Sequence, residues 1–189
     1  AAIQMEEFAR IPGMPLIYAA SHDDLVALAS SSKVASLIST REGLTTGDND
    51  QFLRRWFEVS EKKIAPPSAV SEEGSKFTTH RWYMYVKGGE FRRWYGNLDF
   101  VVDWEFDGAR VKANVDAKTG RIRSHNYNGD YSFREGLTWS GVSSSKCSAR
   151  HVPKGYMFDA KGPMGFGRDR TDLLAALAVL NSGVADRFL

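Results

Sequence analysis

Hydrophobic and polar residues alternate most regularly between positions 100 and 106. One set of alternate positions is Phe100, Val102, Trp104 and Phe106, and the other is Val101, Asp103 and Glu105. Because successive side chains of a β-strand point to opposite faces of a sheet, this period of two predicts a half-buried strand. The acidic residues at 99, 103, 105 and 107 are interpreted as its solvated face.

Two segments carry helix signals. Ser21 is a favourable N-cap, Asp24 stands where a capping box requires an acceptor, and the serines at 30–32 are expected to end this helix. A second helix is predicted over 172–180, capped by Thr171 or Asp169 and stopped at 181–183. Its residues are apolar almost all round, which predicts a buried helix.

The middle of the chain is predicted to consist of short strands, turns and long loops. Further strands are expected within 52–59, 81–86, 131–140, 150–152 and 156–158, with a strand or helical turn at 34–40. Turns are expected at 47–50, 107–108 and 118–120, a glycine-rich turn at 162–167, and an exposed loop at 64–75. Strands in the middle with helices near both ends predict an α+β fold.

Composition narrows the class of protein. The 189 residues carry a formal charge of +2, too small a value to indicate a nucleic-acid partner by itself. The single cysteine, Cys147, excludes an intrachain disulfide and favours a reducing, cytoplasmic compartment. No apolar run approaches the roughly 20 residues that cross a bilayer, so no membrane partner is expected. The chain begins at Ala1 without Met, and we expect it to be a piece of a longer protein.

Positive charge is concentrated in one stretch, residues 81–97. An aromatic strand is expected to end at Gly88-Gly89, and the adjacent Arg92 and Arg93 follow among further aromatic residues. Basic side chains pair with phosphates and aromatic rings offer stacking faces, so this composition suits a polyanion. The alternative is a β-hairpin with half-buried aromatics and solvated arginines. Trp82, Trp94 and Trp139 are expected in the core.

The sequence contains none of the catalytic motifs for which we searched. It has no phosphate-binding Gly-x-x-x-x-Gly-Lys-Ser/Thr loop, no Gly-x-Ser-x-Gly elbow and no metal-ligand spacing among its four histidines and one cysteine. Pro66-Pro67 follows Ile64-Ala65, so the Asn/Asp-Pro-Pro-aromatic loop of adenine methyltransferases is absent too. No enzyme activity and no cofactor or metal is therefore expected in this chain.

Several segments resemble one family in the same order along the chain. Residues 43–53 (GLTTGDNDQFL) look like a segment of TaqI-like target-recognition domains, and 85–97 (YVKGGEFRRWYGN) resemble the adenine-specific DNA methyltransferases of BREX phage-exclusion systems, the PglX-like proteins. Residues 11–15, 133–140, 155–159 and 173–182 continue the resemblance. It implies a TaqI-like target-recognition domain with a twisted, mostly antiparallel or mixed β-sheet and flanking helices.

The resemblance also implies a function. Residues 1–20 would be a connector from a missing methyltransferase domain, which would bind S-adenosylmethionine, and 21–189 would recognise a specific sequence in double-stranded DNA. Other phage-defence proteins are further possible partners. The candidate DNA-binding residues are Thr46, Asn49, Lys87, Arg92, Arg93, Arg121, Arg123 and Arg134. For Thr46 and Asn49 the alternative is a self-capping turn.

Two other functions remain open. Exposed aromatic residues next to arginines are also typical of protein interfaces, which would make the chain a protein-interaction module within a multi-protein defence complex. A complete small enzyme is the third possibility, and the lack of catalytic motifs argues against it.

Overall fold

The computed structural model describes residues 21–70, 80–140 and 146–188. The chain divides into two compact units, residues 1–36 and 37–189. The expected connector, residues 1–20, lies outside the described residues. The first unit contains helix α2 (His22–Ser30) and a 3₁₀ turn η1 (Val34–Ser36). The predicted capping box is confirmed, because Ser21 N–H donates to Asp24 Oδ2 and Asp24 N–H donates to Ser21 Oγ.

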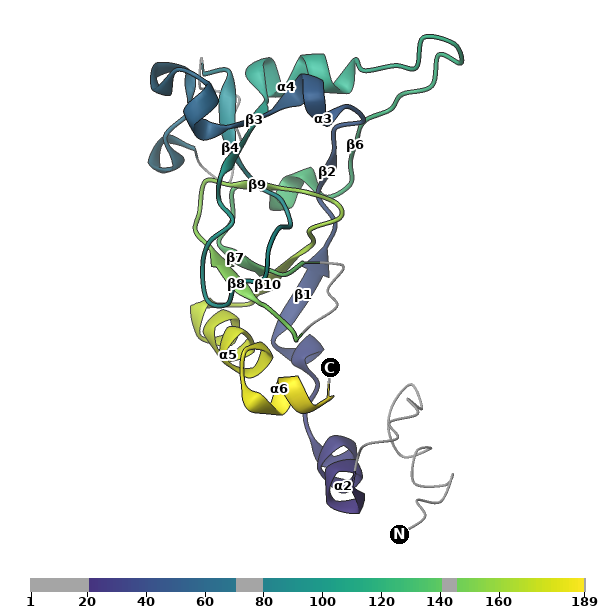
Figure 1. Cartoon of the computed structure of the whole chain (residues 1–189), viewed down its shortest axis with the longest axis vertical. Helices are drawn as coiled ribbons and strands as arrows, with labels where there is room; N and C mark the ends of the chain where they lie inside the picture. The colour runs from purple at the N-terminus through teal and green to yellow at the C-terminus, as the bar shows by residue number, and fades with distance from the viewer. Residues whose placement is uncertain (1–20, 71–79, 141–145, 189) are drawn as a thin grey trace. The chain divides into compact units, whose positions relative to one another are not determined.

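The second unit is built on two four-stranded sheets and a two-stranded pair (Figure 1). The first sheet has the order β1 (Ile38–Arg41), β10 (Met164–Gly167), β7 (Gly136–Thr138), β8 (Arg150–Val152), and the second has β3 (Leu53–Arg55), β5 (Phe100–Asp103), β4 (Trp82–Val86), β9 (Met157–Phe158). The pair is β2 (Leu44–Thr45) with β6 (His125–Asn126). Only β4 and β9 pair in parallel among these neighbours. The predicted α+β fold with mostly antiparallel or mixed sheets is confirmed.

Short helices flank the sheets. The α-helices are α3 (Asn49–Phe52), α4 (Glu105–Lys112), α5 (Arg170–Leu180) and α6 (Gly183–Phe188), and the 3₁₀ turns are η2 (Trp56–Glu58), η3 (Glu61–Lys63), η4 (Pro67–Ala69) and η6 (Gly129–Tyr131). In Figure 1, α5 lies against β10 and β1, whereas α3 and α4 lie beside β3 and β5. The start of α4 is not helical, because residues 106–108 have positive φ.

The predicted solvated face of β5 is wrong. Val101 and Val102 are both buried, and Asp103 is only 1% exposed. The strand pairs with β3 and β4 along its two edges, and the burial of three successive residues, 101–103, shows that both of its faces are covered. Asp103 is stabilised there by Arg81, whose Nε and Nη2 lie 3.1 and 2.9 Å from Oδ2, and by Arg110. The strand ends before the predicted Phe106, which is 80% exposed.

Three other local predictions need correction. The glycine-rich segment 162–167 is mainly strand β10, in the centre of its sheet. The segment 52–59 contains strand only at 53–55, because α3 precedes it and η2 follows it. The segment 64–70 is not a wholly exposed loop, since Ala65 and Val70 are buried, while residues 71–75 lie outside the described part of the chain.

Helix α5 is confirmed, but its expected all-round burial is wrong. Asp169 caps it by accepting from Asp172 N–H at 2.9 Å. Leu173, Ala176 and Leu177 are buried, whereas Leu174 and Val179 are exposed. The helix therefore covers the sheet with one face only, as an amphipathic surface helix does.

Candidate nucleic-acid interface

The turn that contains Thr46 and Asn49 is held by its own side chains. Thr46 is 3% exposed, and its hydroxyl donates to Asn49 Oδ1 at 2.7 Å and accepts from Asp48 N–H at 3.3 Å. Asp48 in turn caps α3 through Gln51 N–H at 3.0 Å. Thr46 is thus directed into the turn, while Asn49 is exposed at its surface.

Strand pairing brings this turn close to Lys87. Leu44 in β2 forms a parallel bridge with Asp159, directly after β9, and Val86 at the end of β4 pairs with Phe158 in β9. Both pairings are parallel, and the turn follows β2 while Lys87 follows β4, so both emerge at the C-terminal end of β9. The turn with Thr46 and Asn49 therefore lines one region together with Lys87, which is far from it in sequence.

Asn49 and Lys87 stand on the wall shared by two adjoining hollows of about 360 and 430 Å³. We call the two hollows together the Asn49–Lys87 groove. The first is lined by Thr45, Thr46, Gly47, Asp48, Asn49, Lys87, Gly88, Asp159, Lys161 and Gly162, and the second by Asn49, Asp50, Leu53, Arg54, Arg55, Glu58, Lys87 and Phe100. Acidic and basic groups are mixed along the groove, so it is not simply a cationic channel.

The acidic groups of the first hollow are occupied by internal hydrogen bonds. Asp159 accepts from the Tyr85 hydroxyl at 3.0 Å and from Lys161 N–H at 2.7 Å. Burial of Tyr85, reinforced by the Asp159 charge, raises the pKa of its phenol well above the ordinary value, so the phenol stays a donor. Lys87 Nζ lies 5.7 Å from the Phe100 ring centroid, and no carboxylate among the described residues pairs with it. Its charge is available to a ligand.

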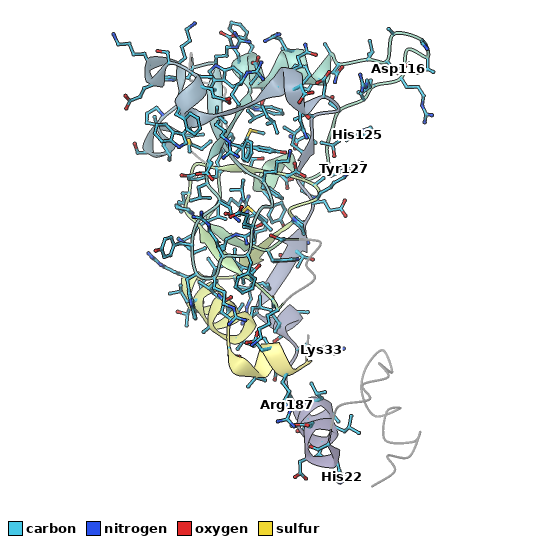
Figure 2. The ribbon with its side chains drawn as sticks, viewed as in Figure 1. His22, Lys33, Asp116, His125, Tyr127 and Arg187 are labelled. Carbon is cyan, nitrogen blue, oxygen red and sulfur yellow. The ribbon has the colours of Figure 1, made fainter. Side chains whose placement is uncertain are left out.

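A β-hairpin, residues 113–124, adjoins the groove; we call it the 113–124 arm. Val115 and Ile122 form an antiparallel bridge, and Asp116 N–H and Gly120 N–H close the turn with carbonyls of Arg121 and Asp116 at 2.8 Å each. Figure 2 shows the arm projecting, with Asp116 near its end. Hydrogen bonds, first of all from Thr119 N–H, lower the pKa of Asp116 and keep it in the turn.

The arm carries exposed cations and is anchored to the Thr46 turn. Lys118, Arg121 and Arg123 are exposed. At the base, Asn114 Nδ2 donates to Thr46 O at 3.0 Å. Gly47 packs closely on Arg123, and a Cβ added at Gly47 would lie 2.6 Å from Arg123 Cβ. The predicted Arg123 therefore lies beside the turn that contains Asn49, and the predicted Arg121 lies further out on the same arm.

The predicted pair Arg92 and Arg93 lies further along the loop that begins at Lys87, residues 87–99, and its two members differ. Arg93 bonds Asp186 of α6 and the Cys147 carbonyl (3.2 Å). Burial alone would raise the pKa of Asp186, but hydrogen bonds from Arg93 and Lys146 outweigh it and lower the pKa. Arg93 is thus engaged within the fold, whereas Arg92 is exposed.

The remaining predicted residues lie elsewhere. Arg134 is half-buried, and its guanidinium carbon lies 4.9 Å from the Tyr131 ring centroid. The guanidinium carbon of Arg41 lies at the same distance from this ring. Trp82 is in the core as predicted, and Trp139 is half-buried. Trp94 is 49% exposed, so its predicted core position is wrong. It has a φ of 75° and stands beside the exposed Phe91 and Tyr95.

Sequence reasoning missed several residues of this region. Lys161, Asp159 and Asn114 contribute to the groove or to the base of the arm, and Lys118 extends the cationic surface of the arm. The signal for Lys118 was present, since it precedes the predicted Arg121 and Arg123 in the same loop. The other three act through tertiary contacts and have no local signature.

Neither a metal-binding cluster nor a membrane-spanning helix occurs in the described ranges. Within residues 21–70, 80–140 and 146–188, no three His, Cys, Asp or Glu side chains lie together as a metal would require. None of the helices described is long and apolar enough to cross a bilayer.

Comparison with known proteins connects the chain to large methyltransferases. No protein-family model matches the sequence. The chain is homologous to a segment of adenine-specific methyltransferases, which confirms the PglX-like resemblance. It is 47% identical, over 96% of its length, to adenine-specific methyltransferase PglX of Lacticaseibacillus casei (strain Zhang), and 35% identical, over 93%, to adenine-specific methyltransferase BrxX of Escherichia coli O9:H4 (strain HS). It spans only 15% and 13% of those two proteins.

The difference between Arg92 and Arg93 leads to a stability prediction. Arg93→Ala removes the bonds to α6 and to the Cys147 carbonyl, and we expect it to lower the melting temperature by about 2–4 °C. Arg92→Ala removes an exposed side chain and is expected to leave the melting temperature nearly unchanged. Thermal unfolding followed by circular dichroism measures both, and equal shifts would contradict the assignment.

The Arg93 effect should also depend on pH. Because the pKa of Asp186 is lowered in the folded state, its ion pair stabilises the fold above the ordinary aspartate range. That stabilisation is lost as the pH falls through the lowered pKa. The melting-temperature difference between wild type and Arg93→Ala is therefore expected to shrink below about pH 4.

Proposed function

We propose that this chain is a DNA target-recognition domain within a larger adenine-specific methyltransferase of the PglX type. The observation that carries the proposal is the junction of the Asn49–Lys87 groove with the cationic 113–124 arm. A polar groove beside exposed lysine and arginine side chains offers both base-reading and phosphate-binding groups. The homology supports the methyltransferase part of the proposal, since both relatives are adenine-specific methyltransferases.

The proposed roles follow from the chemistry of each part. A two-stranded β-ribbon fits the major groove of a duplex, and the arm has that form. Lys118, Arg121 and Arg123 would neutralise phosphates and set the register, with Lys87 as a further contact at the groove. The domain would hold the duplex so that another part of the parent methylates the chosen adenine.

The same proposal assigns the remaining chemistry to the parent protein. S-adenosylmethionine would be bound outside this chain, and the adenine would be extruded from the duplex into that catalytic part. Other phage-defence proteins would be partners of the parent. No catalytic step is assigned to the residues of this domain.

A salt titration tests the proposal. Binding of the 189-residue chain to a labelled random-sequence duplex is measured by fluorescence anisotropy at several salt concentrations. We expect log K to fall with log[salt] with a slope of roughly −3 or steeper, at about −0.9 per neutralised phosphate. The double variant Arg121→Ala, Arg123→Ala is expected to make the slope shallower by about 1–2.

The matched control removes the same charge elsewhere. Lys62 and Lys63 are exposed on η3 and line neither the groove nor the arm. Lys62→Ala, Lys63→Ala is expected to leave the slope close to that of the wild type. Equal effects of the two double variants would contradict the proposed face, and no binding even at low salt would contradict the proposed function.

One observation favours a second candidate, a protein-interaction surface. Phe91, Trp94 and Tyr95 are all exposed within five positions of the 87–99 loop. Exposed aromatic residues of this kind are typical anchors of protein interfaces. Affinity for a protein partner that is insensitive to salt and lost in Trp94→Ala would support this candidate.

A further inference from the structure

The side-chain amide of Asn49 has a defined orientation. Thr46 is buried, and its hydroxyl has a single proton to donate; among the described residues, Asn49 Oδ1 at 2.7 Å is the acceptor that receives it. Asp48 N–H already donates to the same hydroxyl oxygen. Reversing the amide would place Nδ2 against Thr46 and leave a buried hydroxyl proton without an acceptor, which is unfavourable.

This orientation leaves a donor and an acceptor free side by side. No group in the described part of the chain accepts from Asn49 Nδ2, and its Oδ1 has a second lone pair beyond the bond to Thr46. Asn49 is exposed, and it stands where the two hollows of the groove meet. The amide is therefore both oriented and accessible.

The free pair of groups matches one base. In the major groove adenine presents the N7 acceptor beside the N6 amino donor, whereas guanine presents two acceptors, cytosine a donor, and thymine an acceptor beside a methyl group. A phosphate presents only acceptors, and Oδ1 together with the nearby Asp48 and Asp159 would disfavour it. The groove chemistry thus favours a neutral base edge.

We infer that Asn49 reads an adenine of the recognition sequence through its N7 and N6 groups, and that Thr46 is the positioning residue that fixes the amide. This inference rests on the proposed DNA-recognition function and names a specificity determinant within it. The adenine that Asn49 reads remains in the duplex, and is distinct from the adenine that is extruded for methylation.

In-vitro selection from a randomised duplex pool tests the inference with the 189-residue chain. The wild type is expected to enrich a motif with at least one position dominated by adenine. Replacing that adenine by 7-deazaadenine removes only the N7 acceptor and is expected to weaken wild-type binding by roughly tenfold. In Asn49→Ala the adenine preference and the 7-deazaadenine penalty are expected to disappear, while the other positions of the motif persist.

Two variants of Thr46 separate positioning from stability. Thr46→Val keeps the shape but removes the hydroxyl, and is expected to reduce the adenine preference at the same position of the motif. Thr46→Ser keeps the hydroxyl and is expected to restore that preference. A general loss of stability would weaken binding to every sequence by the same factor and leave the 7-deazaadenine penalty unchanged, whereas a loss of positioning reduces that penalty.

The outcomes distinguish this inference from the proposed function. If wild type and Asn49→Ala enrich the same motif with the same 7-deazaadenine penalty, the role of Asn49 is overturned and DNA recognition stands. If the wild type enriches no motif, both fall. If Asn49→Ala loses adenine selectively but Thr46→Val retains it, the positioning role of Thr46 is overturned.

Discussion

Gly43→Ala is expected to destabilise the domain by about 3 kcal/mol, because position 43 has no room for a side chain. A Cβ there would lie 2.0 Å from the carbonyl oxygen of Phe158 and 2.7 Å from its Cδ2 atom. Phe158 is fully buried in β9, and the bridge between Leu44 and Asp159 holds the two segments together. Neither backbone can move away without breaking that contact.

The measurement is thermal unfolding of the variant beside a matched glycine substitution. For a domain of this size, about 3 kcal/mol corresponds to a fall of roughly 6–12 °C in melting temperature. Gly183→Ala at the start of α6 is the control, because an added Cβ there meets nothing within 4 Å. It is expected to leave the melting temperature unchanged or slightly higher. A tolerated Gly43→Ala would contradict the close approach of β2 to β9.

The close approach of β2 to β9 also explains how far the candidate site could be predicted from sequence. Turn chemistry at 47–50 and the basic composition of 81–97 identified Asn49 and Lys87 separately, because both signals are local. Their meeting depends on β9, which is more than 60 residues further along the chain and pairs with β4 while its end bridges to β2. No local pattern encodes that pairing.

Burial and pairing account for the predictions that were wrong. The alternation around Asp103 predicts a strand, but it does not show that the rest of the fold buries both faces of that strand. The DNA contact predicted for Arg93 stays a prediction, and its internal partner Asp186 has no local signal because it lies 93 residues away in sequence. The glycines of β10 suggest a turn locally, whereas pairing with β1 and β7 makes the segment a central strand.

Helix signals were more reliable because they depend on neighbouring residues. Ser21 with Asp24 and Asp169 with Asp172 form their caps within four positions. The predicted all-round burial of α5 is wrong because burial depends on residues that are distant in sequence. Which of its apolar residues face β10 is decided by the sheet, so Leu174 and Val179 remain exposed.

Arg150→Ala is the second substitution with a large expected effect, and its cause is lost volume. Arg150 in β8 is 0% exposed and is among the largest fully buried side chains among the described residues. Its Nη1 donates to the carbonyls of Ser148 (3.2 Å) and Arg92 (3.4 Å), and its Nη2 to Ser140 Oγ (3.4 Å). Truncation to Ala leaves a cavity and is expected to cost about 2–5 kcal/mol.

Arg150→Met is expected to cost much less, because no carboxylate among the described residues balances the Arg150 charge. Burial, together with the nearby Arg92, lowers the pKa of its guanidinium, as expected for a cation without an anionic partner. Methionine fills most of the volume and removes the cost of burying a charge, while the carbonyls lose one donor. We therefore expect the melting temperatures of wild type and Arg150→Met to lie within a few degrees of each other. Both are expected to be well above the melting temperature of Arg150→Ala. If Met proves as damaging as Ala, the hydrogen bonds that hold the 87–99 loop, rather than the filled volume, account for the contribution of Arg150.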